Sequence, residues 1–226
     1  MRTLLRILAY LLLIVFLLLS AWQLFEIVCW LVLDGGYKLY LWLGIGAAVY
    51  VVLRRIPFFS KNVVWFEIHT HEWLHTVVAW TFGQKIHLVS ASENEGLLLH
   101  SGRFGRNIFI SLAPYCLPIY TLFFCVLRLF SAYEWLHIFD LLIGFTLAFH
   151  LVAFIKQAKP YQPDLKVFGL TTSYIFIVAS LFFNFLIVLL TIKMGIDNAS
   201  IFIVEQYWER LQYLYAVIYS LNINLL

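Results

Sequence analysis

The chain has 226 residues, of which 63% are hydrophobic and only 12% are charged. A soluble domain has about 45–50% apolar and about 25% charged residues, so this composition excludes a soluble globular protein and predicts a polytopic membrane protein of one domain. The net charge of +3 is small and spread along the chain without a basic cluster, which excludes nucleic acid as a partner.

Two membrane spans are predicted at the N-terminal end of the chain. The apolar run Ile7–Phe25 is longer than a signal-peptide core, and no small-x-small cleavage site follows it, so we expect a retained helix. Asp34-Gly35-Gly36 ends this helix. The second span covers Tyr37–Leu53, where Gly44 and Gly46 are candidates for close packing against another helix.

The third predicted span runs from about Asn62 to Phe82 and precedes the one clearly polar insertion, Gln84–Arg106. Within this insertion, two short stretches of alternating apolar residues flank Glu93-Asn94-Glu95-Gly96, which is typical of a turn between strands. The insertion therefore predicts a short β-hairpin that follows the third span directly.

The remainder of the chain predicts three more spans and a surface helix. The spans are Asn107–Leu127, Tyr133–Ile155 and Val167–Ile192, with a polar joint, Lys156–Lys166, before the last of them. We interpret His137 and Asp140 as a paired contact between helices. The tail Ile201–Leu221 mixes apolar residues with charged ones, which is typical of an amphipathic helix on the membrane surface or against the bundle.

These elements predict an all-α membrane protein with about six transmembrane helices, a short β-hairpin insertion and an amphipathic C-terminal helix. A helical bundle is expected because it satisfies the backbone hydrogen bonds in lipid. Its parts are two N-terminal spans (1–58), a middle part (60–170), and the last span with the C-terminal helix (167–226). Counting spans places the C-terminal end of the third span, the hairpin and the polar joint on one side of the membrane. Positive charges are nearly balanced between the two sides and do not set the orientation.

The third span carries the motif His71-Glu72-x-x-His75. On a helix, residues four apart lie on one face, so both imidazoles can bind one metal ion. Glu72 is displaced by about 100° around the helix, which places its carboxylate beside the ion, where it can take a proton from water. Ionisable side chains are costly in an apolar helix and are usually functional there. The motif therefore predicts a zinc site with Glu72 as the catalytic residue.

A catalytic zinc ion has three protein ligands, so one more must come from another part of the chain. Asp164 lies in the polar joint, on the hairpin side of the membrane, where Pro163 suits a helix start. His150, on the helix leading into the joint, is the alternative ligand or an outer partner. Glu67 lies four residues before His71 on the same helix face, where its carboxylate could hold an imidazole.

With these residues in place, the chain resembles the site-2 protease family of intramembrane zinc metalloproteases over residues 60–170. In that family one membrane helix carries H-E-x-x-H, a hairpin or loop follows, and an aspartate at the end of the third core helix completes the zinc site. Ser111-Leu112-Ala113-Pro114 is similar to the small-residue and proline stretch of the second core helix. Asp164 stands in Gln162-Pro163-Asp164-Leu165, whereas the family usually has N-P-D-G or L-D-G.

The resemblance implies hydrolysis of peptide bonds in membrane-protein segments, with zinc as the cofactor, Glu72 as the general base and the hairpin on the cytosolic side. The hairpin edge would pair with an unwound substrate segment. The compactness of the chain favours a bacterial inner membrane. A different class of function also fits the residues: a metal-binding or catalytically inactive protease-like subunit of a larger membrane complex. The sequence names no substrate.

Overall fold

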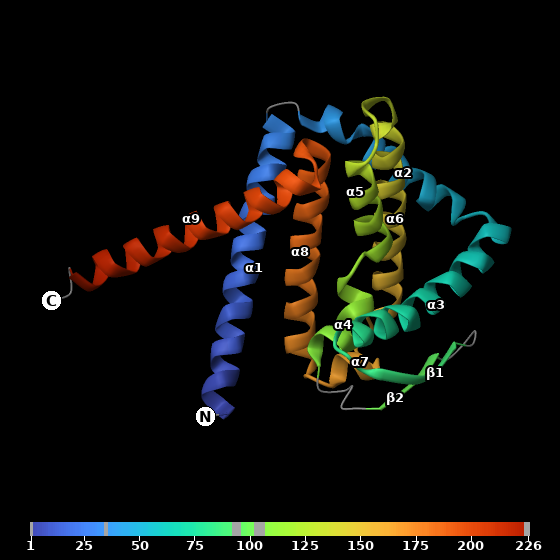
Figure 1. Cartoon of the computed structure of the whole chain (residues 1–226), viewed down its shortest axis with the longest axis horizontal. Helices are drawn as coiled ribbons and strands as arrows, with labels where there is room; N and C mark the ends of the chain where they lie inside the picture. Colours follow the sequence, from blue (N-terminus) through green and yellow to red (C-terminus); the bar gives the residue numbers. More distant parts are fainter. Residues whose placement is uncertain (1, 34–35, 92–95, 102–106, 224–226) are drawn as a thin grey trace.

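The computed structural model describes residues 2–33, 36–91, 96–101 and 107–223, and in both strands it describes the backbone alone. Within these ranges the chain is a bundle of helices with one pair of strands (Figure 1). The elements are α1 (Arg2–Leu33), η1 (Gly36–Tyr40), α2 (Leu41–Leu53), α3 (Pro57–Thr81), β1 (Lys85–Ala91), β2 (Gly96–Ser101), α4 (Ile108–Cys116), α5 (Ile119–Leu129), η3 (Tyr133–Trp135), α6 (Leu136–Gln157), α7 (Pro163–Lys166), α8 (Leu170–Met194) and α9 (Ile196–Ile223).

Four helical segments in the described residues are long and apolar enough to cross a membrane, namely Ile7–Leu33, Gly36–Leu53, Tyr133–Gln157 and Leu170–Met194. The bent pair of α4 and α5 makes a fifth if it counts as one broken span. The helical membrane class is therefore confirmed, whereas the predicted number of six spans is not. The difference is α3, whose motif side chains and Lys61 make it too polar to qualify.

The hydrophobic core is centred on α8, which contacts α1, α4, α5 and α9. Its side chains Ile177, Leu186 and Val188 are fully buried. In contrast, the C-terminal half of α9 extends away from the bundle (Figure 1). The middle of α9 is held by an ion pair between Arg210 and Glu26 of α1 and by a hydrogen bond between the Tyr207 and Ser20 hydroxyls.

α2 and α6 approach each other closely at Gly46 and Gly144, where the contact leaves no room for a side chain. A Cβ atom on Gly46 would lie 2.0 Å from the Leu141 carbonyl oxygen, and one on Gly144 would lie 2.0 Å from the Leu43 carbonyl oxygen. A Cβ on Gly44 would meet nothing within 4 Å. Of the two glycines that the sequence suggested for close packing, Gly46 makes the contact and Gly44 does not.

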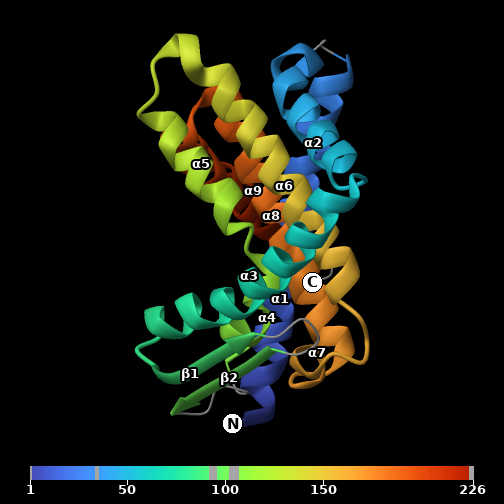
Figure 2. The same cartoon turned by 90° about the vertical axis from the view of Figure 1, so that its right-hand side faces the viewer.

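A sharp bend separates α4 from α5. The predicted span at 107–127 is broken at Leu117 and Pro118, and the two helices make an angle of 74°. Asn184 of α8 donates to the Cys116 carbonyl oxygen (2.8 Å), which satisfies a backbone acceptor that the break exposes. The bend directs α4 toward α3 and the strands, while α5 packs along α6 (Figure 2).

The strands, α4, α7 and the second half of α3 lie together at one end of the molecule (Figures 1 and 2). β1 and β2 are antiparallel, with Lys85 opposite Ser101 and Ala91 opposite Gly96, and the register shifts between Ile86 and Leu88. Of the predicted turn, residues 93–95 lie outside the described residues. As expected, the end of α3 and the joint that carries Asp164 lie at the same end of the bundle.

Candidate metal centre

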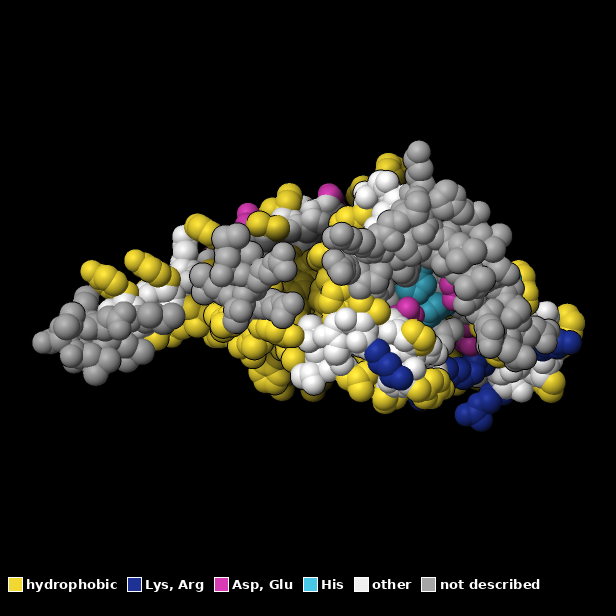
Figure 3. Space-filling view, turned by 90° about the horizontal axis from the view of Figure 1, so that it is seen from below, with side chains coloured by type: hydrophobic (Ala, Val, Ile, Leu, Met, Phe, Trp, Pro, Cys, Tyr) yellow, Lys and Arg dark blue, Asp and Glu magenta, His cyan; other side chains and the backbone are white. Residues whose placement is uncertain are grey.

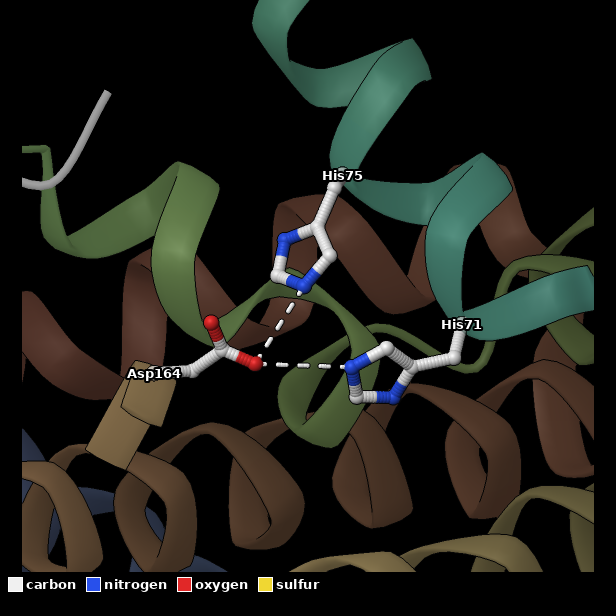
Figure 4. Close-up of side chains that lie close together, drawn as sticks. All are labelled: His71, His75 and Asp164. Carbon is white, nitrogen blue, oxygen red and sulfur yellow. Dashed lines mark ion pairs between the residues drawn. The ribbon is translucent and has the colours of Figure 1, made fainter. Parts of the chain in front are cut away.

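Two histidines of α3 and one aspartate of α7 meet at this end of the bundle (Figure 4). The Nε2 atoms of His71 and His75 each lie 3.4 Å from Oδ2 of Asp164. All three potential ligand atoms lie within 4.8 Å of one another. α3 brings the histidines together because they are one turn apart, and the break between α6 and α8 allows the short α7 to bring Asp164 to them.

The spacing of these atoms suits a metal ion better than direct hydrogen bonds. Nitrogen-to-oxygen hydrogen bonds are usually 2.7–3.2 Å long, so 3.4 Å is a weak contact for an imidazole and a carboxylate. Two ligand atoms that are each about 2.1 Å from one ion at a tetrahedral angle are about 3.4 Å apart. The Asp164 oxygen is therefore at ligand spacing from both imidazoles.

Outer contacts orient both rings so that Nε2 faces Asp164. His75 Nδ1 lies 2.8 Å from the Ile110 carbonyl oxygen, which can only accept, so Nδ1 carries the proton. His71 Nδ1 lies 2.9 Å from Oε1 of Gln157, whose amide donates to the Glu67 carbonyl oxygen (3.4 Å). In both rings the lone pair is then on Nε2, which is the arrangement that metal-binding histidines require.

Tyr115 of α4 holds the carboxylate. Its side chain is fully buried, and its hydroxyl donates to Oδ2 of Asp164 (3.3 Å). Burial alone would raise the pKa of the Asp164 carboxyl, but when His71 and His75 carry a second proton on Nε2, their hydrogen bonds and charges outweigh burial and hold this pKa below its ordinary range. A metal ion would take the place of these protons between the imidazoles and the carboxylate.

Glu72 is half-buried beside this group, one residue from His71. Among the described residues its carboxylate makes no hydrogen bond or ion pair, yet it is close enough for its charge to act on His75 and Tyr115. Seen from below, histidine and acidic side chains meet in a hollow of the surface (Figure 3). The site thus combines three candidate ligands with a carboxylate that has no structural partner in the described part of the chain.

Two other residues suggested by the sequence lie elsewhere. The Glu67 carboxylate forms an ion pair with Arg54 (2.6 Å) and accepts from the Tyr50 hydroxyl (3.2 Å), so it does not hold an imidazole. His150 is buried in α6, outside the ligand group, and its Nε2 has no hydrogen-bond partner among the described residues. Between the two candidates for the third ligand, the geometry favours Asp164.

Sequence reasoning missed Gln157 and Tyr115. One signal for Gln157 was available: it lies seven residues after His150, hence on the same face of α6. Tyr115 directly follows the Ser111–Pro114 stretch, but its role depends on the bend that follows it. Comparisons with family models, with curated proteins and with solved structures found no match to this chain.

Proposed function

We propose that this protein is an intramembrane zinc metalloprotease similar to the site-2 proteases, and that it cleaves segments of other membrane proteins. The observation that carries the proposal is the meeting of His71, His75 and Asp164 beside Glu72, in a chain with four or five candidate membrane spans. The residues His71 and Asp164 are far apart in sequence, so a chance motif would not explain their convergence.

The donor set fits zinc, since two imidazole nitrogens and one carboxylate oxygen leave the fourth position of a tetrahedral ion open. The same donors also suit ferrous iron. No other group of three or more histidine, cysteine or acidic side chains in the described residues has metal-binding spacing. The geometry of this group supports it as the site of the proposed ion, and metal analysis distinguishes zinc from iron.

The residues of the site can perform peptide hydrolysis. A bound zinc ion would polarise the peptide carbonyl and lower the pKa of a water molecule. The Glu72 carboxylate takes a proton from the attacking water and donates it to the leaving amine nitrogen. Gln157 and Tyr115 keep His71 and Asp164 in place during this transfer. The strands beside α3 offer an edge along which an unwound substrate segment can extend.

Metal content tests the proposal first. We expect one zinc ion per chain in detergent-purified native protein, measured together with iron by mass spectrometry. Glu72→Gln should retain the zinc because Glu72 is not a ligand, whereas His71→Ala and Asp164→Ala should lose it. Native protein without zinc after purification with added metal would overturn the proposal. Zinc that survives Asp164→Ala would refute Asp164 as the third ligand.

A cleavage assay tests the proposed proteolytic activity. A panel of labelled single-span membrane peptides is incubated with native protein and with Glu72→Gln in the same detergent. We expect new peptide termini with the native chain alone. Cleavage that is equal in both samples would refute Glu72 as the base. Zinc binding without cleavage of any peptide would favour the alternative function, a metal-binding subunit of a membrane complex.

A further inference from the structure

A second site is suggested by a groove of about 650 Å³ between α3, α5 and α6. Its wall is mainly aromatic, and none of its lining residues belongs to the metal centre. Phe66 contacts two other rings of the wall, with its ring centroid 5.6 Å from that of Tyr120 and 5.5 Å from that of Phe149. Figure 2 shows the three helices that enclose the groove.

The polar side chains in the wall already have partners within the protein. Tyr50 donates to Glu67 (3.2 Å), and Tyr120 shares a hydrogen bond with Thr70 (3.3 Å). Asn62 and Thr146 donate to carbonyl oxygens of their own helices (3.1 and 2.8 Å). The groove therefore offers little to a polar ligand and fits an apolar one.

The size of the groove helps to distinguish two apolar occupants, a transmembrane helix and a lipid hydrocarbon chain. A helix with its side chains is about 10–12 Å wide and rises about 5.4 Å per turn, so one turn occupies about 420–610 Å³. The groove is thus much smaller than a whole transmembrane helix of about 20 residues. A flexible hydrocarbon chain can follow its full length, and the volume lies within the range of small-molecule pockets, about 300–1,000 Å³.

Positive charge lies beside the groove. Lys61 is exposed and is three residues after Phe58 and four before Trp65, both of which line the groove, so it lies on the adjoining face of α3. Arg55 lies in the turn before α3. Neither makes an ion pair or hydrogen bond within the described residues, whereas Arg54 is neutralised by Glu67. No acidic residue occurs from 54 to 66.

We propose that this groove binds an acidic phospholipid, with one acyl chain against the aromatic wall and the phosphate group near Arg55 and Lys61. An apolar groove with unpaired cations beside it matches the two parts of such a lipid. Basic pockets between membrane helices bind acidic head groups, and each basic residue near an anionic lipid surface favours binding. The proposal does not depend on the proteolytic function.

Lipid binding to the full-length protein tests the proposal. Phosphatidylglycerol and phosphatidylcholine with identical acyl chains are titrated into detergent-purified protein, and retained lipid is counted by native mass spectrometry. We expect one saturable phosphatidylglycerol per chain and at least tenfold weaker retention of phosphatidylcholine. Replacing both basic side chains (Arg55→Gln with Lys61→Gln) should weaken the binding of phosphatidylglycerol by about thirtyfold. A matched control, Lys38→Gln with Lys166→Gln, removes two exposed charges elsewhere and should leave binding unchanged.

A second variant tests the groove itself. Thr146→Trp fills the space between α3 and α6 and should remove the bound lipid without altering zinc content. Equal retention of both lipids together with no effect of the charge variant would overturn the proposal. The same holds if Thr146→Trp leaves phosphatidylglycerol bound but blocks peptide cleavage, because the groove would then receive a peptide segment. Should Thr146→Trp fail to fold, the charge variant and its control still decide the result.

Discussion

Two aspartates in this bundle differ in how their negative charge is compensated. Asp140 of α6 pairs with Arg128 of α5 (2.7 Å), and the same guanidinium donates to the carbonyl oxygens of Thr191 and Ile192 (3.2 and 3.3 Å). Asp164 of α7 meets two imidazoles and a tyrosine hydroxyl, none of which carries a permanent positive charge.

The difference separates a structural carboxylate from one that can bind a cation. A charge inside a bundle needs a compensating charge or several hydrogen bonds. Arg128 supplies both for Asp140 and ties α5, α6 and α8 together. At Asp164 the chain supplies oriented donors only, and the side chain is 24% exposed, compared with 8% for Asp140. A cation bound from outside would supply the missing positive charge at this end.

The largest effect on stability is expected from removing the charged side chain of Arg128, which pairs with Asp140. Arg128→Met leaves Asp140 buried without a partner, and we expect the free energy of unfolding to fall by about 3–5 kcal/mol. In protein treated with a chelator, Asp164→Asn should change the free energy of unfolding by less than about 1 kcal/mol, because this substitution leaves no cation unpaired. Denaturant unfolding in detergent measures both, and similar losses in the two variants would contradict the distinction.

Added zinc should stabilise the folded protein through the Asp164 site and not through the Asp140 site. A metal ion that binds the folded chain at a hundred times its dissociation constant adds about 2.7 kcal/mol to the free energy of unfolding. We expect this shift in thermal unfolding for the native protein, its reversal by a chelator, and its absence in Asp164→Ala. Asp140→Asn, although less stable, should retain the shift. A shift that persists in Asp164→Ala would place the ion elsewhere.

α6 carries Asp140 near its start and Gln157 at its end, so its packing on α2 links the two sites. Gly144→Ala places a Cβ against the Leu43 carbonyl oxygen, and we expect a loss of about 1–3 kcal/mol in unfolding free energy. Gly44→Ala is the matched control, since nothing lies within 4 Å of its Cβ, and it should stay within about 0.5 kcal/mol. Equal stability of the two alanine variants would contradict this close contact.

The smallest effect is expected from the residues that orient the ligands. Gln157→Leu and Tyr115→Phe each remove one outer hydrogen bond, and we expect zinc affinity to fall about 10–100-fold. Competition with a fluorescent chelator measures the affinity. His69→Ala provides the control on the same helix, because that ring stacks on Trp65 (centroids 3.7 Å apart) outside the metal-ligand group. Unchanged affinity in both Gln157→Leu and Tyr115→Phe would show that the imidazoles and Asp164 are held without them.

Local patterns in the sequence were sufficient for part of this description. The apolar runs predicted the helical membrane class, and the spacing of His71 and His75 predicted one shared helix face. Counting spans also placed Asp164 at the correct end of the bundle. The predicted number of six spans is not confirmed, because the polar side chains of α3 keep it out of the candidate spans.

Partners across the bundle were harder to predict. Asp140 was expected to contact His137 but pairs with Arg128, and the His137 ring lies against Trp42 instead. Glu67 was expected to lie near an imidazole but pairs with Arg54. In both cases several suitable groups were near in sequence, and only the packing angles of the helices determined which of them came within reach.

By itself, the sequence determined that the chain is a helical membrane protein and that α3 presents two imidazoles with a neighbouring carboxylate. Those properties depend on composition and on the 3.6-residue period of a helix, which are local. Only the tertiary structure decided that Asp164 meets the two imidazoles and that Gln157 and Tyr115 contact this group. Gln157 is 86 positions from His71 and Tyr115 is 49 from Asp164, so their contacts depend on how α6 meets α3 and how α4 meets α7, which no local pattern encodes.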